Sequence, residues 1–188
     1  MDGVIIREAQ RSDLPRLLEI YTYYVKHTAI TFDYEVPSRE AFAETMDRVC
    51  EKYPYLVLEQ AGRVQGYAYA RPFVGRAAYD WSCEMTIYLD PNAVGHGLGR
   101  RLYEALEARL SRMGILNLYA CIGYPEREDE YLTKNSASFH AHMGFTKVGT
   151  FHNCGYKFGR WYHMIWMEKI IGTAGEDQAP VIPYPALS

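Results

Sequence analysis

A cluster of glycines is the part of the sequence whose spacing points most directly to chemistry. Gly95, Gly97 and Gly99 alternate with His96 and Leu98, directly after a strand-like segment and before a helix-like one. A strand that turns through glycines into a helix directs several backbone N–H groups, and the positive end of the helix dipole, at one point. That point favours an anion, most often a phosphate. A tight packing turn is the alternative that the loop alone leaves open.

Two common phosphate-binding loops do not fit this cluster. A Walker loop ends in Gly-Lys-Ser/Thr, whereas here Gly97 is followed by Leu98 and Gly99 by Arg100. A dinucleotide loop places its third glycine differently and needs an acidic residue about 20 residues later, where this chain reads Cys121-Ile122-Gly123. The loop therefore does not predict nucleoside triphosphate hydrolysis, and it predicts NAD binding only weakly.

A carboxylate precedes the loop on a strand with two different faces. From Trp81 to Leu89 the residues alternate strictly, and Glu84 shares its face with Ser82, Thr86 and Tyr88. A carboxylate here suits proton transfer beside the anion site. A solvated side chain on a half-exposed strand is the competing interpretation, and the residues alone leave both open.

The imidazole and thiol groups predict neither a metal nor a covalent intermediate. His140 and His142 lie two apart on a helix expected over 135–143, so their side chains point in different directions and no ligand set completes them. We predict no metal. The cysteines lack a Cys-x-x-Cys pair or an adjacent base, so we expect reduced, mostly buried thiols rather than nucleophiles; they are Cys50, Cys83, Cys121 and Cys154.

Composition limits the class of protein and of partner. The chain has 188 residues, a formal charge of −3 and 48% hydrophobic residues, which suits one folded domain with a sizeable core. Basic residues do not cluster as binding to nucleic acid or an anionic membrane requires. No signal-like start and no apolar run of about 18 residues is visible, so we expect a cytoplasmic protein. We place a single domain at 1–171 and a flexible, proline-containing tail at 172–188.

The elements that must position these groups follow from hydrophobic periodicity and turn signals. An acidic stretch, 126–130, reads as a loop before the helix over 135–143. The remaining expected elements are a strand at 4–8, a helix capped by Ser12, a helix between Ser38 and Pro54, a hairpin of 55–60 and 64–72, a helix from Leu98 to Met113 closed by Gly114, and strands at 116–122, 145–151 and 161–168.

The order and spacing of five short segments resemble the GNAT-type N-acetyltransferases, and most closely their phosphinothricin acetyltransferase-like branch. The resemblance runs from Ile5 to Lys169. It implies an α/β fold with a mixed, mostly antiparallel central sheet, splayed strands and helices on both faces, and a homodimer. The segments are Tyr53–Val57, Tyr79–Glu84, Gly97–Gly99, Phe139–His140 followed by Gly144–Phe145, and Lys157–Trp161.

The resemblance implies acetyl-CoA as the acetyl donor. The backbone of Ile87, Tyr88 and Leu89 would pair with the pantetheine arm. Family members usually carry Gln or Arg where this chain has Val94, so a side-chain contact to the phosphate is lost. Asn135 and Ser136 would lie near the CoA, although Asn135 also reads as a helix N-cap. The amides that would hold the diphosphate belong to Val94, Gly95, His96, Gly97, Leu98, Gly99 and Arg100.

The same resemblance assigns catalytic roles. Glu84 occupies the family's general-base position, usually acting through water. His140 stands where many members have a general-acid tyrosine, and it would either protonate the CoA thiolate or pack beneath the cofactor.

On the acceptor side, Arg76 is the expected partner of a carboxylate, because a guanidinium binds it bidentately. The acceptor implied is a small amino-acid-like amine, of the phosphinothricin, methionine sulfone or methionine sulfoximine kind, acetylated directly in a ternary complex. Alternatives are a polyamine, for which the acidic 126–130 stretch would be suited, an aminoglycoside, a protein N-terminus, or a non-catalytic acyl-CoA sensor. The acceptor candidates are Phe32, Arg76, Tyr79, Trp161, Tyr162 and His163.

Overall fold

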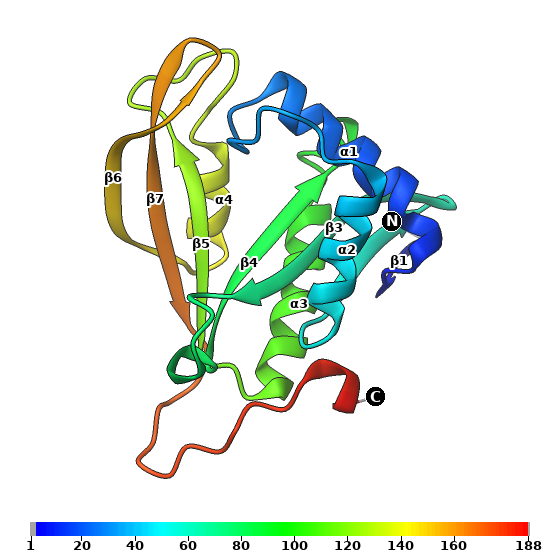
Figure 1. Cartoon of the computed structure of the whole chain (residues 1–188), viewed down its shortest axis with the longest axis vertical. Helices are drawn as coiled ribbons and strands as arrows, with labels where there is room; N and C mark the ends of the chain where they lie inside the picture. The colour runs from blue at the N-terminus through cyan, green and yellow to red at the C-terminus, as the bar shows by residue number, and fades with distance from the viewer. Residues whose placement is uncertain (1–2, 188) are drawn as a thin grey trace. The chain divides into compact units, whose positions relative to one another are not determined.

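The computed structural model describes residues 3–187 (Figure 1). Within that range the strands are β1 (Val4–Glu8), β2 (Tyr55–Gln60), β3 (Arg63–Pro72), β4 (Ser82–Leu89), β5 (Asn117–Tyr124), β6 (Thr146–Lys157) and β7 (Arg160–Ile170). The helices are α1 (Leu14–His27), α2 (Arg39–Cys50), α3 (Leu98–Met113) and α4 (Asn135–His142), with 3-10 turns η1 (Arg11–Asp13), η2 (Ala77–Tyr79), η3 (Pro91–Ala93) and η4 (Tyr184–Leu187).

The strands follow the order β1-β2-β3-β4-β5-β7-β6. The pairs β1–β2, β2–β3, β3–β4 and β6–β7 are antiparallel. The predicted mixed α/β fold with a mostly antiparallel sheet is therefore confirmed.

The described chain divides into two compact units. Unit 1 comprises the described parts of 1–20, 37–118 and 170–188, and unit 2 comprises 21–36 and 119–169. Unit 1 thus contains β1 to β4, α2 and α3, whereas unit 2 contains α4, β6 and β7. The glycine loop and Glu84 belong to unit 1, and His140 belongs to unit 2.

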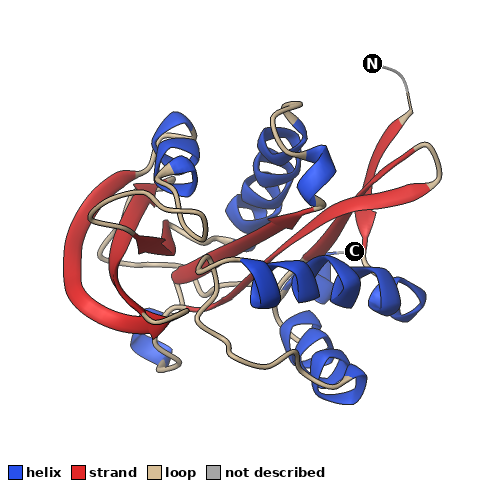
Figure 2. Cartoon of the chain, turned by 90° about the horizontal axis from the view of Figure 1, so that it is seen from above, coloured by secondary structure: helices blue, strands red, loops and turns tan. Residues whose placement is uncertain are grey.

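In unit 1 helices cover both faces of the strands (Figure 2). The strand β2 is buried from Tyr55 to Leu58, as expected of a strand with no solvated face. The Phe42 ring of α2 meets the Tyr67 ring edge-on, with centroids 6.4 Å apart. The helix α3 lies on the opposite side of the strands, behind them in Figure 1, with its apolar stripe of leucines buried.

Local signals set several element ends correctly. The Ser38 hydroxyl accepts the Ala41 N–H at 3.1 Å and caps α2. Gly114 closes α3 with a left-handed φ of 89°. At the start of the first helix the expected cap was wrong, because the helical segment begins with η1, whose N-cap is Gln10, so Ser12 lies inside that turn. The Asp13 carboxylate at the end of the turn accepts the Gln10 N–H at 2.8 Å.

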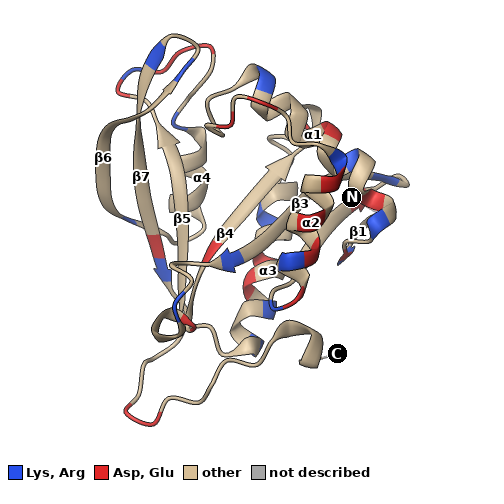
Figure 3. Cartoon of the chain, in the orientation of Figure 1, with Lys and Arg blue, Asp and Glu red and all other residues tan. Residues whose placement is uncertain are grey.

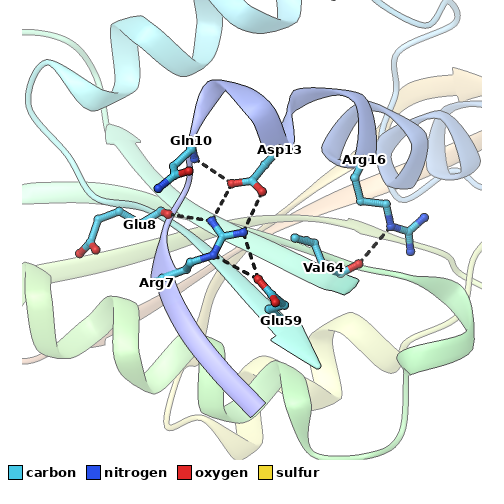
Figure 4. Close-up of polar contacts among 7 residues, drawn as sticks. All are labelled: Arg7, Glu8, Gln10, Asp13, Arg16, Glu59 and Val64. Atoms are coloured by element: carbon cyan, nitrogen blue, oxygen red, sulfur yellow. Dashed lines mark hydrogen bonds and ion pairs between the residues drawn. The ribbon is translucent and has the colours of Figure 1, made fainter. Parts of the chain in front are cut away.

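A charged cluster joins the first strand to its neighbour and to the first helix (Figure 4). The Arg7 guanidinium donates to both Asp13 oxygens, at 2.7 and 2.8 Å, and reaches Glu59 of β2 at 3.2 Å. Arg16 donates to the Val64 carbonyl oxygen at 3.0 Å. The fork of each guanidinium thus crosslinks segments far apart in sequence.

The C-terminal tail differs from the flexible extension that its prolines predict. Its backbone N–H groups find carbonyl partners in unit 1: Ile182 donates to Met113 and Tyr184 to Lys52, both at 2.9 Å. The Ala179 carbonyl accepts the Trp81 indole N–H at 2.8 Å. Figure 1 shows the tail, in red, returning to the C-terminal end of α3. Proline has no backbone N–H to donate, so the residues between the prolines supply the donors that attach the tail to unit 1.

The strand β6 is longer than the segment expected at 145–151. Its pairing with β7 shifts register between Phe151 and Gly155, and Asn153 there has a φ of 47°. A bulge of this kind breaks the period-two pattern by which sequence reasoning recognises a strand.

Charged residues do not gather into one patch on the helices α2 and α3. Acidic and basic positions mix along α2 and α3 instead of forming one run (Figure 3). Over residues 3–187, no helix combines the length and apolarity that crossing a membrane requires.

The expectation of mostly buried thiols was wrong, because Cys83 is buried, Cys50 is half-buried, and Cys121 and Cys154 are exposed.

Candidate active site

Glu84 is a buried carboxylate rather than a solvated one. It lies on β4 and is only 7% exposed, and its neighbour Ser82 is buried as well. The face expected to be polar is therefore covered at Ser82 and Glu84 and half-buried at Thr86 and Tyr88, so Glu84 is not a solvated side chain. A carboxylate is seldom buried to this extent unless it is paired.

The partner of Glu84 is Arg71. The register of β3 and β4 sets the two residues opposite each other, and the Arg71 Nη2 lies 2.6 Å from the Glu84 Oε1. The Arg71 side chain is 52% exposed while that of Glu84 is 9% exposed. The pair therefore has one buried end and one end that faces solvent.

Stacked tyrosines continue the same face of the β2–β4 strands. The Tyr55 and Tyr69 rings stack with centroids 4.7 Å apart, and Tyr55 and Tyr67 with centroids 5.8 Å apart. Tyr67 also contacts Tyr88 at 5.6 Å. Burial raises the pKa of Tyr55 well above its usual value, so its hydroxyl stays protonated.

The end of β4 is held closely against β3. Ile87, Tyr88 and Leu89 face Ala68, Tyr67 and Gly66 in register. A Cβ on Gly66 would lie 2.4 Å from the Leu89 Cδ2, so only glycine allows this approach. Since alternate residues of an antiparallel strand turn their N–H and C=O groups to opposite edges, β4 also presents backbone groups on the edge away from β3.

The glycine loop leads from β4 into α3 with the backbone conformation that an anion site needs. Gly95 and Gly97 have φ values of 89° and 74°, and a Cβ on either would meet nothing within 4 Å. Gly97 is the N-cap of α3, and the Arg101 N–H is bonded to its carbonyl oxygen at 3.4 Å. The amides of residues 98–100 precede that first helical bond, so they lack intrahelical acceptors and can face a ligand.

The side chains of the loop show why its chemistry rests on the backbone. Leu98 and Gly99 are buried and anchor the start of α3, whereas Val94 is 55% exposed and His96 is exposed. Arg100 is exposed and forms a 2.7 Å ion pair with Glu104. An unobstructed turn of amides at a helix start fits a diphosphate, the group expected of CoA.

In unit 2, His140 is a buried and neutral imidazole. It is 4% exposed, and its Nδ1 donates to the Ser136 carbonyl oxygen at 2.7 Å. Phe139 and Phe145 contact the ring edge-on. Burial lowers the pKa of His140 to about 4, so little imidazolium is present near neutral pH. Of the two interpretations left open, the geometry favours packing over donation of a proton.

The start of α4 differs by one residue from the expected cap. Lys134 is the N-cap and Asn135 is the first residue of the helix, so the capping role for Asn135 was wrong. Asn135 is exposed, and Ser136 is half-buried.

The two acceptor candidates of unit 1 lie in the connection between β3 and β4. Arg76 is the N-cap of η2 and is exposed, and its carbonyl oxygen accepts the Tyr79 N–H at 2.8 Å. The Tyr79 ring is 42% exposed and meets Phe73 edge-on at 6.0 Å. Both side chains are accessible to a solute.

The acceptor candidates of unit 2 have different environments. Phe32 stacks on Tyr162 with centroids 6.4 Å apart. Trp161 is exposed and contacts Tyr156, whereas the His163 Nδ1 accepts the Asn153 N–H at 2.9 Å. Tyr162 is 2% exposed and belongs to the hydrophobic core of unit 2.

The acidic stretch is structural. Asp129 accepts the Tyr162 hydroxyl at 2.9 Å, and Arg160 pairs with Asp129 and Glu130, each at 2.9 Å. Burial would raise the pKa of the Asp129 carboxyl, but the hydrogen bonds from Arg160 and the loop amides outweigh it and lower that pKa. These carboxylates already have a cation, which weakens the case for a polyamine bound there.

Sequence reasoning did not identify two charged residues, Arg71 and Lys157, as candidates for the site. Arg71 follows Tyr67 and Tyr69 in the period-two pattern of β3, but only the register with β4 sets it against Glu84. Lys157 is 3% exposed, and its Nζ donates to the Thr31 carbonyl oxygen at 2.7 Å. Burial lowers the pKa of Lys157. Over residues 3–187, no cluster of three or more His, Cys, Asp or Glu side chains is arranged to hold a metal.

Comparison with known proteins agrees with this geometry. The acetyltransferase (GNAT) domain model matches residues 6–166. A phosphinothricin N-acetyltransferase of Streptomyces viridochromogenes is 33% identical over 97% of this chain and 92% of that protein. An L-methionine sulfoximine/L-methionine sulfone acetyltransferase of Salmonella typhimurium is 32% identical over 87% of this chain and 92% of that protein. A GNAT superfamily phosphinothricin acetyltransferase from Sinorhizobium meliloti, solved in complex with AcCoA, has a TM-score of 0.86 and 31% identity, covering 97% of this chain and 98% of that one.

Proposed function

This chain belongs to the GNAT acetyltransferase family, and we propose that it transfers the acetyl group of acetyl-CoA to the amine of a small amino-acid-like acceptor. Phosphinothricin, methionine sulfone and methionine sulfoximine are the acceptor types that its relatives' names suggest. The observation that carries this proposal is that one strand, β4, brings a candidate base and a candidate anion site together. The strand β4 bears the buried Glu84 carboxylate, and the turn that follows it exposes the amides of a helix start.

In the reaction we propose, the acceptor nitrogen attacks the thioester carbonyl, a C–N bond forms and the C–S bond breaks. Glu84 takes the proton of the acceptor ammonium, directly or through water, and so leaves the nitrogen lone pair available. The burial of Glu84 on β4 supports this role, because it holds the carboxylate in a fixed position on a paired strand.

The amides after Gly97 would bind the CoA diphosphate, and the backbone of Ile87, Tyr88 and Leu89 would pair with the pantetheine arm. Asn135 and Ser136 would contact CoA from α4. His140 would support α4 as a neutral, packed residue. With its pKa near 4, it is not available as an acid at neutral pH, so the CoA sulfur would leave as the thiolate. The second proton that the acceptor nitrogen loses as the amide forms would pass through water to that thiolate or to solvent.

Direct transfer in a ternary complex is favoured over an acetyl-cysteine intermediate. Burial raises the pKa of the Cys83 thiol, and Glu84 next to it in sequence adds to that effect. A thiol held in its neutral form is a weak nucleophile.

We also propose that the protein is a cytoplasmic homodimer. The exposed aromatic side chains on β6 and β7, among them Phe151, Tyr156 and Trp161, support a subunit interface there. Light scattering should then give about twice the mass of the chain, and a mass near 21.7 kDa would contradict the dimer.

A continuous assay of thiol release from acetyl-CoA tests the activity. The panel contains methionine sulfone, methionine sulfoximine, phosphinothricin, common amino acids, polyamines, an aminoglycoside and a short peptide with a free N-terminus. Turnover of the sulfone-like acids supports the proposal. Turnover restricted to polyamines or the aminoglycoside would contradict the acceptor class. Silence across the panel, with acetyl-CoA still raising the melting temperature, would favour a non-catalytic sensor.

A further inference from the structure

We propose that Arg71 is a specificity-determining residue that binds the acceptor's α-carboxylate while Glu84 binds its ammonium. This inference rests on the proposed function and deepens it, because it states which feature of the acceptor the site selects. The juxtaposition that carries it is a cation and an anion on adjacent strands, 2.6 Å apart, of which the cation is half-exposed.

The charges match those of one class of acceptor. An α-amino acid carries an ammonium and a carboxylate on the same carbon, so these groups lie about 3 Å apart by covalent geometry. The Arg71–Glu84 pair offers the opposite charges at nearly the same separation. A zwitterion can therefore align against the pair with each charge facing its opposite.

The exposure of the pair supports this direction of approach. The Arg71 side chain is 52% exposed and that of Glu84 is 9% exposed, so a solute reaches the guanidinium before it reaches the carboxylate. A guanidinium has five N–H donors in a planar fork, which lets it hold Glu84 and grip a second carboxylate as well. The acceptor's carboxylate would then position its nitrogen beside Glu84.

The alternative partner for the acceptor's carboxylate is Arg76, and the two arginines differ in their surroundings. Arg76 lies in the connection between β3 and β4, where its backbone caps η2. Arg71 lies within β3, opposite Glu84 in the register. The rigid strand pairing holds Arg71 at a constant separation from the proposed base, which an exposed connection does not ensure.

The same argument explains which amines the site would reject. A polyamine brings further positive charge to Arg71, and a peptide N-terminus has an amide where an amino acid has its carboxylate. Each leaves the guanidinium without a new anionic partner. The site would thus favour free amino acids over both classes.

The test compares Arg71→Gln with the unaltered enzyme on two acceptors, methionine sulfone and its carboxamide. We expect Arg71→Gln to lower kcat/KM for the acid by about 10- to 100-fold, the range of a lost charge-assisted bond, mainly through KM. For the carboxamide, kcat/KM should change by less than about threefold, and Arg71→Lys should restore part of the preference for the acid.

Arg63→Gln is the matched control, since Arg63 lies on the same strand and forms an exposed ion pair with Glu19. Arg63→Gln should leave kcat/KM unchanged for both the acid and the carboxamide. Equal losses on acid and carboxamide with Arg71→Gln would overturn the inference, as would an acid-selective loss with Arg76→Gln alone. If the unaltered enzyme acetylates no amino acid at all, the proposed function itself fails, and this outcome is visible before any variant is made. Thermal melts of each variant exclude misfolding as the cause.

Discussion

The Tyr184 hydroxyl donates to the Glu8 carboxylate at 2.5 Å, which fastens the last helical turn of the chain to its first strand. Arg109 of α3 donates to the same hydroxyl at 3.1 Å. The hydrogen bond from Tyr184 lowers the pKa of Glu8. The tail is thereby bonded to the first strand, β1, and to α3.

Tyr184→Phe should destabilise the protein by about 1 kcal/mol, because it removes a hydrogen bond to a charged group at a partly exposed site. The melting temperature should fall by about 2–4 °C. Tyr23→Phe, at another exposed tyrosine outside the tail, serves as the control. Truncation after Ile171 should lower the melting temperature further, since the Trp81 and Met113 partners are lost as well. An unchanged melting temperature after truncation would show that the tail does not stabilise unit 1.

Glu84→Gln should lower kcat by about 100-fold or more, because the amide accepts no proton from the acceptor. Binding of acetyl-CoA, measured by its thermal shift, should be retained. Glu19→Gln, at an exposed glutamate outside the site, should leave kcat unchanged. A normal rate for Glu84→Gln would exclude the proposed base.

His140 should make folding stability depend on pH between about 6.5 and 4. Its pKa is lowered to about 4 in the folded protein, whereas an unfolded histidine titrates near 6.5. The unfolded state therefore binds the extra proton in that range, and stability is lost as the pH falls. The full effect is about 3 to 4 kcal/mol, since the pKa falls from 6.5 to about 4 and each pKa unit corresponds to about 1.4 kcal/mol.

Urea denaturation at several pH values measures this effect. His140→Gln should flatten the decline between pH 6.5 and 4, whereas His142→Gln should not, although His142 makes the same kind of bond to a backbone carbonyl on the same helix, at 2.7 Å. A kcat that drops as the pH rises through 6 to 7 because of His140 would contradict its assignment as a neutral, packed residue.

Gly97→Ala should weaken acetyl-CoA binding by about tenfold, because the left-handed φ of 74° at the N-cap of α3 is strained for alanine and the amides after it would turn away. Gly62→Ala is the control, since Gly62 in the β2–β3 turn has a φ of 73° and equal space around its Cβ position. Both variants should lose about 1 kcal/mol of stability. Equal acetyl-CoA affinity in the two variants would contradict a diphosphate site at Gly97.

Sequence by itself determined the features that depend on local chemistry. Glycines that permit positive φ, a serine that caps α2 and the spacing of apolar residues act over a few residues, so the glycine loop, α3 with its closing Gly114 and the β2–β3 hairpin could be located from the sequence. Glu84 was identified by alternation along one strand. Each of these signals is contained within the element that it describes.

Tertiary structure alone decided which residues from distant parts of the chain contact one another. Strand register brought Arg71 to Glu84, because the turn between β3 and β4 has no spacing signal that sets the pairing. Burial of His140 and the resulting pKa depend on side chains from outside α4. The prolines of the tail predicted a flexible extension, but its attachment depends on carbonyl groups about 70 and 130 residues away along the chain, at Met113 and Lys52. Contacts of this kind leave no local pattern, since the physical partner of each group is chosen by the folded chain.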